Sequence, residues 1–420
     1  MNKGISSQIF PLTVSNSKNY LLLFALWPFL AFITALTNYS YKDSRKVVFL
    51  FLIYYGLTYV IQTEVYADAA GYALNLKANA VLPFSDFFKI VGGLYTSETS
   101  VDIVEPLISF IVSRFTDDHR ILFALYAAVF GFFYLMSINL LYDRYRGNPG
   151  LDGLIHLVFF IVILPITAIN GFRMWTAAWI FFYGAYHVVL YHDKRYLLIA
   201  LASSFMHWSF LSANVILIIY FLAGNRNFIY WPIAIASFIL PHFMAPVFQL
   251  ISIRLGGAFE GRFEMYSGED YMLVRQQDFE GASWFLKIGN DLVFYYLLLA
   301  MVVIHFKFKS LVKEKAEGNL FSFLLLFLSF VNFGKGIPSF GGRFQIIFFL
   351  FATLYVFLDA VKLPENKINL LTLVGLFPMI LYAAVTFRQG SDSINAWILT
   401  PGLGLPLLVP GLSIADLLFK

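Results

Sequence analysis

The chain has 420 residues, of which 60% are hydrophobic and only 13% are charged, and its mean hydropathy is +0.74. Soluble globular proteins carry about 25% charged residues, so this composition excludes an ordinary soluble protein and indicates a polytopic membrane protein. The net charge is +4, and the Lys and Arg residues are scattered along the chain, which argues against a nucleic-acid-binding protein. The chain contains no cysteine, which excludes disulfides, thiolate catalysis and Cys-ligated metal centres.

Apolar segments that are long enough to enter a membrane recur from one end of the chain to the other. They predict an all-α protein with about 12–13 transmembrane helices in a single membrane domain, residues 1–420. Residues 1–19 lack an apolar core followed by small residues, so we expect no cleaved signal peptide. The predicted segments are residues 20–37, 47–62, 121–141, 154–169, 175–191, 196–222, 231–250, 285–306, 320–331, 344–358, 368–387 and 394–414.

The segment 196–222 determines the predicted topology. Its centre, residues 203–209, is polar, which favours two short helices that meet at a membrane surface over one long helix. With two helices, four basic clusters fall on one side of the membrane, which the positive-inside rule makes cytoplasmic. These clusters are KDSRK (42–46), DRYR (143–146), DKR (193–195) and KFKSLVKEK (307–315). One long helix would instead place KFKSLVKEK outside. We therefore expect the N-terminus outside and the C-terminus inside.

Two long loops, at about residues 63–118 and 252–284, then lie on the outer face. Both are acidic, and interleaved Tyr and Phe residues favour order over disorder. Long loops in a membrane protein are usually functional or disordered. Within the first loop, residues 102–115 have apolar positions at helical spacing, which predicts a helix at the membrane interface.

Candidate cationic and titratable groups fall at the outer ends of apolar helices. Arg173 and Arg343 each occur at the start of such a helix, where a guanidinium can clamp a phosphate through two hydrogen bonds. The alternative for Arg173 is an interfacial arginine whose stem lies along lipid. His207 can exchange a proton near neutral pH, or it packs between helices. Lys335 lies in the Gly/Pro-rich turn before Arg343. Cations gathered on the outer face favour a phosphorylated substrate.

The first outer loop supplies carboxylates and a phenol to the same face. Asp68, Tyr72 and Glu105 are candidate site residues, whereas Asp86, Glu98 and Asp102 are interpreted as solvated loop charges. The sequence contains no Walker A, HExxH, DxD or GxSxG motif in a meaningful context. We therefore expect no metal and no cofactor.

Several short motifs follow one another in a distinctive order. They are D-x-x-x-Y (Asp68, Tyr72), E-P-L (residues 105–107), N-x-x-R-x-x-x-A (Asn170, Arg173, Ala177), a histidine followed by serine (His207, Ser209), and Arg343 at the start of a late helix. In this order the chain resembles the EpsG/Wzy-type family of bacterial polysaccharide polymerases over about residues 20–387. It departs from the usual family pattern at Ala67 and Phe172.

The resemblance implies a GT-C-like membrane glycosyltransferase that joins oligosaccharide repeat units carried on undecaprenyl diphosphate, as in O-antigen and lipopolysaccharide biosynthesis. The enzyme would be a multi-pass protein of the bacterial inner membrane with its active site facing the periplasm. Membrane lipid and a chain-length regulator protein are the expected partners, and no nucleic acid is expected.

In such an enzyme Arg173 and Arg343 would stabilise the leaving diphosphate. His207, Asp68 and Glu105 are then candidate bases, in that order. Tyr72, Asn170, Lys335 and Arg262, which lies in the second outer loop, would bind substrate.

Two alternative functions remain open at this point. An O-antigen ligase or another lipid-linked glycosyltransferase would use the same donor and a similar basic pocket. A polysaccharide flippase or transporter would also have many spans, but it would show paired charges at mid-membrane and internal repeats, and the sequence has neither.

Overall fold

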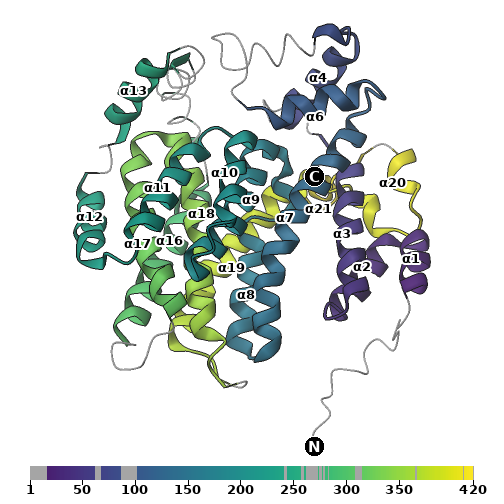
Figure 1. Cartoon of the computed structure of the whole chain (residues 1–420). Helices are drawn as coiled ribbons and strands as arrows, with labels where there is room; N and C mark the ends of the chain where they lie inside the picture. The colour runs from purple at the N-terminus through teal and green to yellow at the C-terminus, as the bar shows by residue number, and fades with distance from the viewer. Residues whose placement is uncertain are drawn as a thin grey trace, which may run out of the picture.

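The computed structural model describes residues 17–61, 68–86, 102–240, 244–256, 260–261, 273, 277, 280–281, 283–307, 315–364, 367–409 and 411–419. The regular structure of these residues is helical, apart from an isolated antiparallel bridge between Asn395 and Ser413 (Figure 1).

The first part of the chain forms α1 (Ser17–Leu26), α2 (Pro28–Thr37), α3 (Lys42–Leu57), α4 (Asp68–Ala80), α6 (Val104–Ser113), α7 (His119–Gly147), α8 (Leu151–Ile163), the 3-10 helix η2 (Ile166–Gly171), α9 (Phe172–Tyr191), α10 (Tyr196–Met206) and α11 (Phe210–Ala223). The second part forms α12 (Asn227–Ile239), α13 (Met244–Leu255), α16 (Trp284–Lys307), α17 (Lys315–Phe333), η4 (Gly334–Gly336), α18 (Pro338–Ala360), α19 (Leu370–Ser391), η5 (Ala396–Leu399), α20 (Leu405–Leu408) and α21 (Ile414–Phe419).

Six helical stretches in the described part of the chain are long and apolar enough to cross a membrane. They are His119–Gly147, Leu151–Tyr191, Trp284–Lys307, Lys315–Gly336, Phe340–Ala360 and Leu370–Ser391. The stretch Leu151–Tyr191 contains α8, η2 and α9. These stretches confirm the predicted all-α polytopic membrane protein. Parts of other predicted spans form shorter apolar helices, Pro28–Thr37, Tyr196–Met206, Phe210–Ala223 and Asn227–Ile239. A further short apolar helix, Val104–Ser113, lies where a helix at the membrane interface was predicted.

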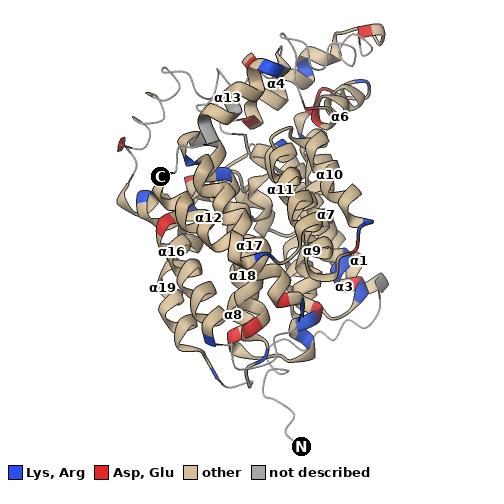
Figure 2. Ribbon diagram, turned by 60° about the vertical axis from the view of Figure 1, so that its left-hand side comes forward, with Lys and Arg blue, Asp and Glu red and all other residues tan. Residues whose placement is uncertain are grey.

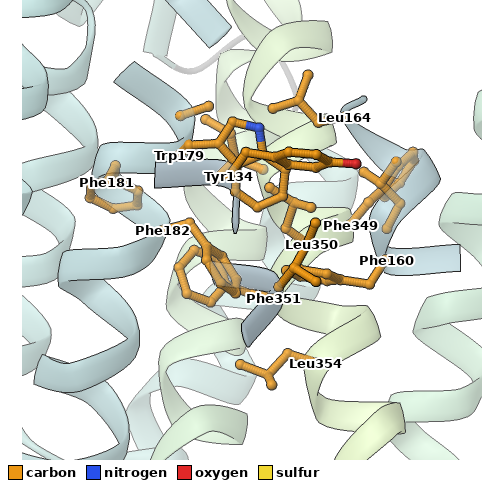
Figure 3. Close-up of a cluster of buried hydrophobic side chains, with 14 of the residues drawn as sticks. Tyr134, Phe160, Leu164, Trp179, Phe181, Phe182, Phe349, Leu350, Phe351 and Leu354 are labelled. Atoms are coloured by element: carbon orange, nitrogen blue, oxygen red, sulfur yellow. The ribbon is translucent and has the colours of Figure 1, made fainter. Parts of the chain in front are cut away.

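Aromatic side chains from α8, α9 and α18 fill the centre of the bundle (Figure 3). Trp179 of α9 lies edge-on to Phe160 of α8 at 5.7 Å between ring centroids, and Phe182 of α9 lies 4.7 Å from Phe351 of α18. Nearly every residue from the start to the end of α9 is buried. These contacts fix both the tilt and the rotation of α9, and so they position the residues at its first turn.

Charged residues gather at the two ends of the bundle, beside α8 at one end and around α4 and α6 at the other (Figure 2). At the α8 end, Arg45 pairs with Asp143 at 2.5 Å, and Lys362 pairs with Glu317. The described residues of the predicted basic clusters therefore share one end, as the two-helix interpretation of residues 196–222 requires.

That interpretation is confirmed by α10 and α11, which are separated at His207 and fold back on each other. The Asn214 amide of α11 donates hydrogen bonds to the Ala200 carbonyl at 3.1 Å and to the Ser204 hydroxyl at 3.0 Å in α10. The prediction of one span over residues 20–37 is wrong, because the extended backbone of Trp27 separates α1 from α2. Each of these helices is too short to cross a bilayer about 30 Å thick.

Gly184 provides a test of how α9 packs, because a Cβ atom at this position would lie 2.5 Å from the backbone nitrogen of Ala200 in α10. Gly184→Ala should therefore push the helices apart and cost about 1–3 kcal/mol, as overpacked cores do. The measurement is the thermal unfolding midpoint of the purified protein in detergent. Gly318→Ala is the control, because a Cβ at Gly318 meets nothing within 4 Å. Equal midpoints for the two variants would contradict the close packing.

Candidate active site

Arg173 lies in the first turn of α9, directly after η2. The preceding residue, Phe172, is fully buried and its ring stacks on Tyr126 of α7 at 3.8 Å between centroids. This stacking fixes the start of α9 against α7. The guanidinium of Arg173 is thereby held beside α4 and the start of α6.

The Arg173 guanidinium is bound on two sides. Its Nη1 lies 3.0 Å from Oδ2 of Asp102, and its Nε donates to the Tyr72 hydroxyl at 3.3 Å. The Asp102 side chain is 3% exposed and that of Arg173 is 21% exposed, so the ion pair is largely withdrawn from solvent. Within the described residues, Nη2 of Arg173 has no hydrogen-bond partner. The arginine is therefore oriented by protein groups and still has N–H groups to offer.

Asp102 corrects the sequence interpretation, which treated this residue as a solvated loop charge. The residue is 2% exposed, and its Oδ1 accepts a hydrogen bond from the backbone N–H of Trp208 at 3.0 Å. Asp102 therefore joins the start of α6 to α9 and to the turn between α10 and α11. Its spacing from Glu105, three residues along a predicted helix, was the signal in the sequence that could have identified it.

Glu105 lies one helical turn after Asp102 and is also buried. Its Oε1 accepts a hydrogen bond from the Tyr126 hydroxyl at 2.9 Å. The ring of Tyr126 is edge-on to that of Tyr72 at 5.5 Å, which links Glu105 to the partner of Arg173. Burial raises the pKa of Glu105, and the hydrogen bond from Tyr126 opposes this effect.

Asp68 and Asn170 lie on either side of the glycine that precedes α9. Asp68 is the exposed first residue of α4 and is close enough to Arg173 and Tyr72 to interact with both electrostatically. A Cβ atom at Gly171 would lie 4.0 Å from Oδ2 of Asp68. Asn170 Oδ1 accepts a hydrogen bond from the backbone N–H of Gly171 at 2.7 Å, which stabilises the end of η2.

His207 occupies the turn between α10 and α11 and is 6% exposed. Its Nδ1 lies 2.8 Å from the hydroxyl of Ser209, so the histidine and serine of the predicted motif are hydrogen-bonded. Ser209 also contacts the sulfur of Met174, the residue after Arg173, at 4.0 Å. His207 thus adjoins the Arg173–Asp102 pair but is covered by protein.

Arg343 in α18 and Lys335 in η4 lie at the same end of the bundle, and η4 contacts both α17 and α18. Phe344, next to Arg343 at the start of α18, packs against Phe210 at the start of α11, 5.4 Å between ring centroids. The Lys335 ammonium lies 4.4 Å from the ring centroid of Phe294.

The structure brings four of the predicted site residues into one cluster: Asp68, Tyr72, Glu105 and Arg173. Asn170 and His207 adjoin this cluster. The two cations, Arg343 and Lys335, lie farther away at the same end of the bundle. Arg262 lies outside the described residues.

A family model, that of the EpsG family, matches residues 83–398, which is well over half of the chain. The chain belongs to the EpsG family. The matched part of this EpsG family member includes Glu105, Arg173, His207 and Arg343, whereas Asp68 and Tyr72 precede it. No curated protein and no solved structure matches the chain significantly, so a GT-C-like arrangement stays a prediction.

The cluster of this EpsG family member combines carboxylates with a guanidinium and phenols. Among the described residues no group of three or more His, Asp or Glu side chains is arranged to hold a metal ion. What the cluster offers chemically is a positive group fixed beside an exposed carboxylate, Asp68. Such a site can bind an anion and accept a proton.

Glu105→Gln tests the burial of this carboxyl group. The ordinary pKa of 4.5 is raised in the folded protein, so the folded state holds the proton more tightly than the unfolded state. The wild type should therefore lose stability as pH rises from about 4.5 through the raised pKa. The variant keeps an acceptor for Tyr126 without titrating, so its advantage in unfolding midpoint should grow with pH over this window. A difference that is constant with pH would contradict the assignment.

Proposed function

We propose that this EpsG family member is an O-antigen or related polysaccharide polymerase that joins oligosaccharide repeat units carried on undecaprenyl diphosphate. Membership of the family supports a polymerase in polysaccharide biosynthesis. The observation that carries the assignment to this site is the buried Arg173–Asp102 pair beside Tyr72. A guanidinium that is already oriented and partly desolvated is suited to a diphosphate leaving group.

In the proposed reaction, a hydroxyl oxygen of the acceptor repeat unit attacks the anomeric carbon of the donor saccharide. The bond from that carbon to the diphosphate oxygen breaks, and its electron pair leaves with undecaprenyl diphosphate. A base takes the proton of the acceptor hydroxyl. Negative charge grows on the diphosphate as its bond breaks, so cations fixed in advance stabilise the transition state more than the ground state.

The geometry supports Asp68 as the base ahead of His207. Asp68 is exposed and stands beside Arg173, whereas His207 is buried and shares a hydrogen bond with Ser209. Glu105 is buried and bound to Tyr126, which favours a structural role. Arg343 is proposed as a second cation for the diphosphate.

The proposed location is the inner membrane, with the site on the periplasmic face. The supporting observation comes from α7. Its residue Tyr126 stacks on Phe172 beside Arg173, whereas Asp143, near the other end of the same helix, pairs with Arg45. Basic residues concentrate on the cytoplasmic side of membrane proteins.

Arg173→Lys tests whether activity requires the oriented guanidinium of Arg173 or only its positive charge. A lysine cannot keep the contacts to Asp102 and Tyr72 and also present a further N–H group, so kcat should fall about 10²- to 10³-fold. Polymer formation from purified lipid-linked repeat units, at matched protein amounts, is the measurement. Arg195→Ala is the control, because Arg195 is an exposed partner of Asp193 outside the site. If the Arg173→Lys variant forms polysaccharide at the normal rate, the proposed role of the Arg173 guanidinium at the diphosphate is excluded.

Asp68→Asn and His207→Gln together identify the base. Removal of a general base costs about 10²- to 10⁴-fold in rate, so Asp68→Asn should lose that much and His207→Gln less than about tenfold. The rates are measured across about pH 6–8, where an ordinary histidine titrates. Asp193→Asn serves as the matched carboxylate control away from the site. An inactive His207→Gln beside an active Asp68→Asn would reverse the assignment.

A further inference from the structure

A cavity of about 720 Å³ lies next to the Arg173 cluster, which is within the range of about 300–1,000 Å³ usual for ligand sites. Its walls come from the end of α8, η2, the first turns of α9 and α16, α18 and the end of α19. The aromatic residues that line it are Trp175 and Tyr382. This cavity has no role in the chemistry described above.

Within the part of the chain that the structure describes, the polar lining of the cavity is uncharged apart from one carboxylate and contains no Lys or Arg. It includes the amides of Asn170, Asn290 and Gln389 and the hydroxyls of Thr167 and Thr386. The carboxylate of Asp392 is bound by Arg388 at 3.1 Å. Among the described residues, the amides of Asn290 and Gln389 have no hydrogen-bond partner. An amide offers two donors and an acceptor together, which suits sugar hydroxyls and not a diphosphate.

Gly289 shows that the cavity is a real gap in the packing. This glycine of α16 is buried, yet a Cβ atom built on it would meet nothing within 4 Å. Protein interiors are normally packed without such voids. The opposite wall is tight, because a Cβ at Gly390 would lie 2.7 Å from the hydroxyl of Thr167. The open space therefore belongs to the cavity and not to general looseness of the helices.

The cavity adjoins the proposed base. A single point, the Cβ position of Gly171, lies 2.9 Å from the indole of Trp175 and 4.0 Å from Oδ2 of Asp68. On the far wall, Ile346 of α18 lines the cavity and Arg343 precedes it by three residues, which places both on one face of the helix. A molecule in the cavity would have the Asp68 carboxylate at one edge and α18 at another.

We propose that this cavity binds the neutral sugars of the acceptor repeat unit and presents an acceptor hydroxyl to Asp68. The inference rests on the proposed polymerase function and specifies where its acceptor is held. Asn290 and Gln389 bind sugar hydroxyls, the Trp175 indole covers one sugar face, and the empty space at Gly289 accommodates the ring. The diphosphate of the donor stays with the cations outside the cavity.

Steady-state kinetics test this assignment first. Asn290→Ala and Gln389→Ala each remove one amide and should raise KM for the acceptor repeat unit roughly three- to tenfold, with kcat at saturating acceptor nearly unchanged. Gly289→Leu should fill the cavity and abolish polymer formation. Gly318→Leu is its control, since a Cβ at Gly318 also meets open space but lies on α17 beside Glu317.

Direct binding tests the inference without catalysis. The probes are the free repeat-unit oligosaccharide, released by mild acid from the lipid-linked substrate, and inorganic pyrophosphate. The oligosaccharide is followed by saturation-transfer NMR of its protons, and pyrophosphate, which has no carbon-bound proton, is followed by the broadening of its phosphorus-31 signal. Gly289→Leu and the double variant Asn290→Ala/Gln389→Ala should lose the oligosaccharide signal and keep the pyrophosphate signal. Arg173→Ala should show the opposite pattern.

The outcomes separate the two proposals. If the wild type makes polymer and both cavity variants keep its KM and its oligosaccharide signal, the cavity assignment is overturned while the polymerase stands. If the wild type makes no polymer but binds the oligosaccharide in a manner that Gly289→Leu abolishes, the cavity is a saccharide site and the polymerase proposal fails. Should Gly289→Leu not fold, the exposed Asn290 and Gln389 decide the question, because their side chains do not fill the core.

Discussion

A guanidinium in the first turn of a buried helix is stable only if neighbouring groups replace the water that it loses. Asp102 and Tyr72 do this for Arg173. The Asp102 carboxylate also accepts a hydrogen bond from the backbone N–H of Trp208. This one side chain therefore connects the start of α6 with α9 and with the turn between α10 and α11. Removing one partner of a buried pair costs about 3–5 kcal/mol, because the other charge is left buried and uncompensated. The position of the whole cluster depends on this pair.

The fold class and the break at His207 could be predicted from the sequence because both rest on local composition. A polar centre in an apolar segment cannot stay in lipid, and the paired helices α10 and α11 follow from that. The break at Trp27 was not predicted, because the apolar segment of residues 20–37 continues across this position. The local signal for that break was Pro28, because a proline disfavours helical backbone at the residue before it, and Trp27 is extended.

For the site, the sequence identified residues whose type is unusual in an apolar setting, such as Arg173 and His207. It misjudged Asp102, because the interpretation as loop charge relied on the acidic character of the surrounding segment. Whether a carboxylate in such a segment is solvated depends on a partner 71 residues away along the chain. The cavity was also invisible in the sequence, since its amides come from η2, α16 and α19 and no spacing connects them.

The helices around the cavity differ in how well they tolerate amino-acid substitutions. Nearly all of α9 is buried, so substitutions there disturb the aromatic core, whereas much of α19 faces outward. Asn290 and Gln389 are exposed residues of α16 and α19, and neither packs in the core. Related chains could therefore acquire new residues at these positions while the charged cluster of α6 and α9 stayed constant. If the cavity binds the acceptor repeat unit as proposed, such substitutions would change the sugars that the enzyme accepts and leave the chemistry that links them intact.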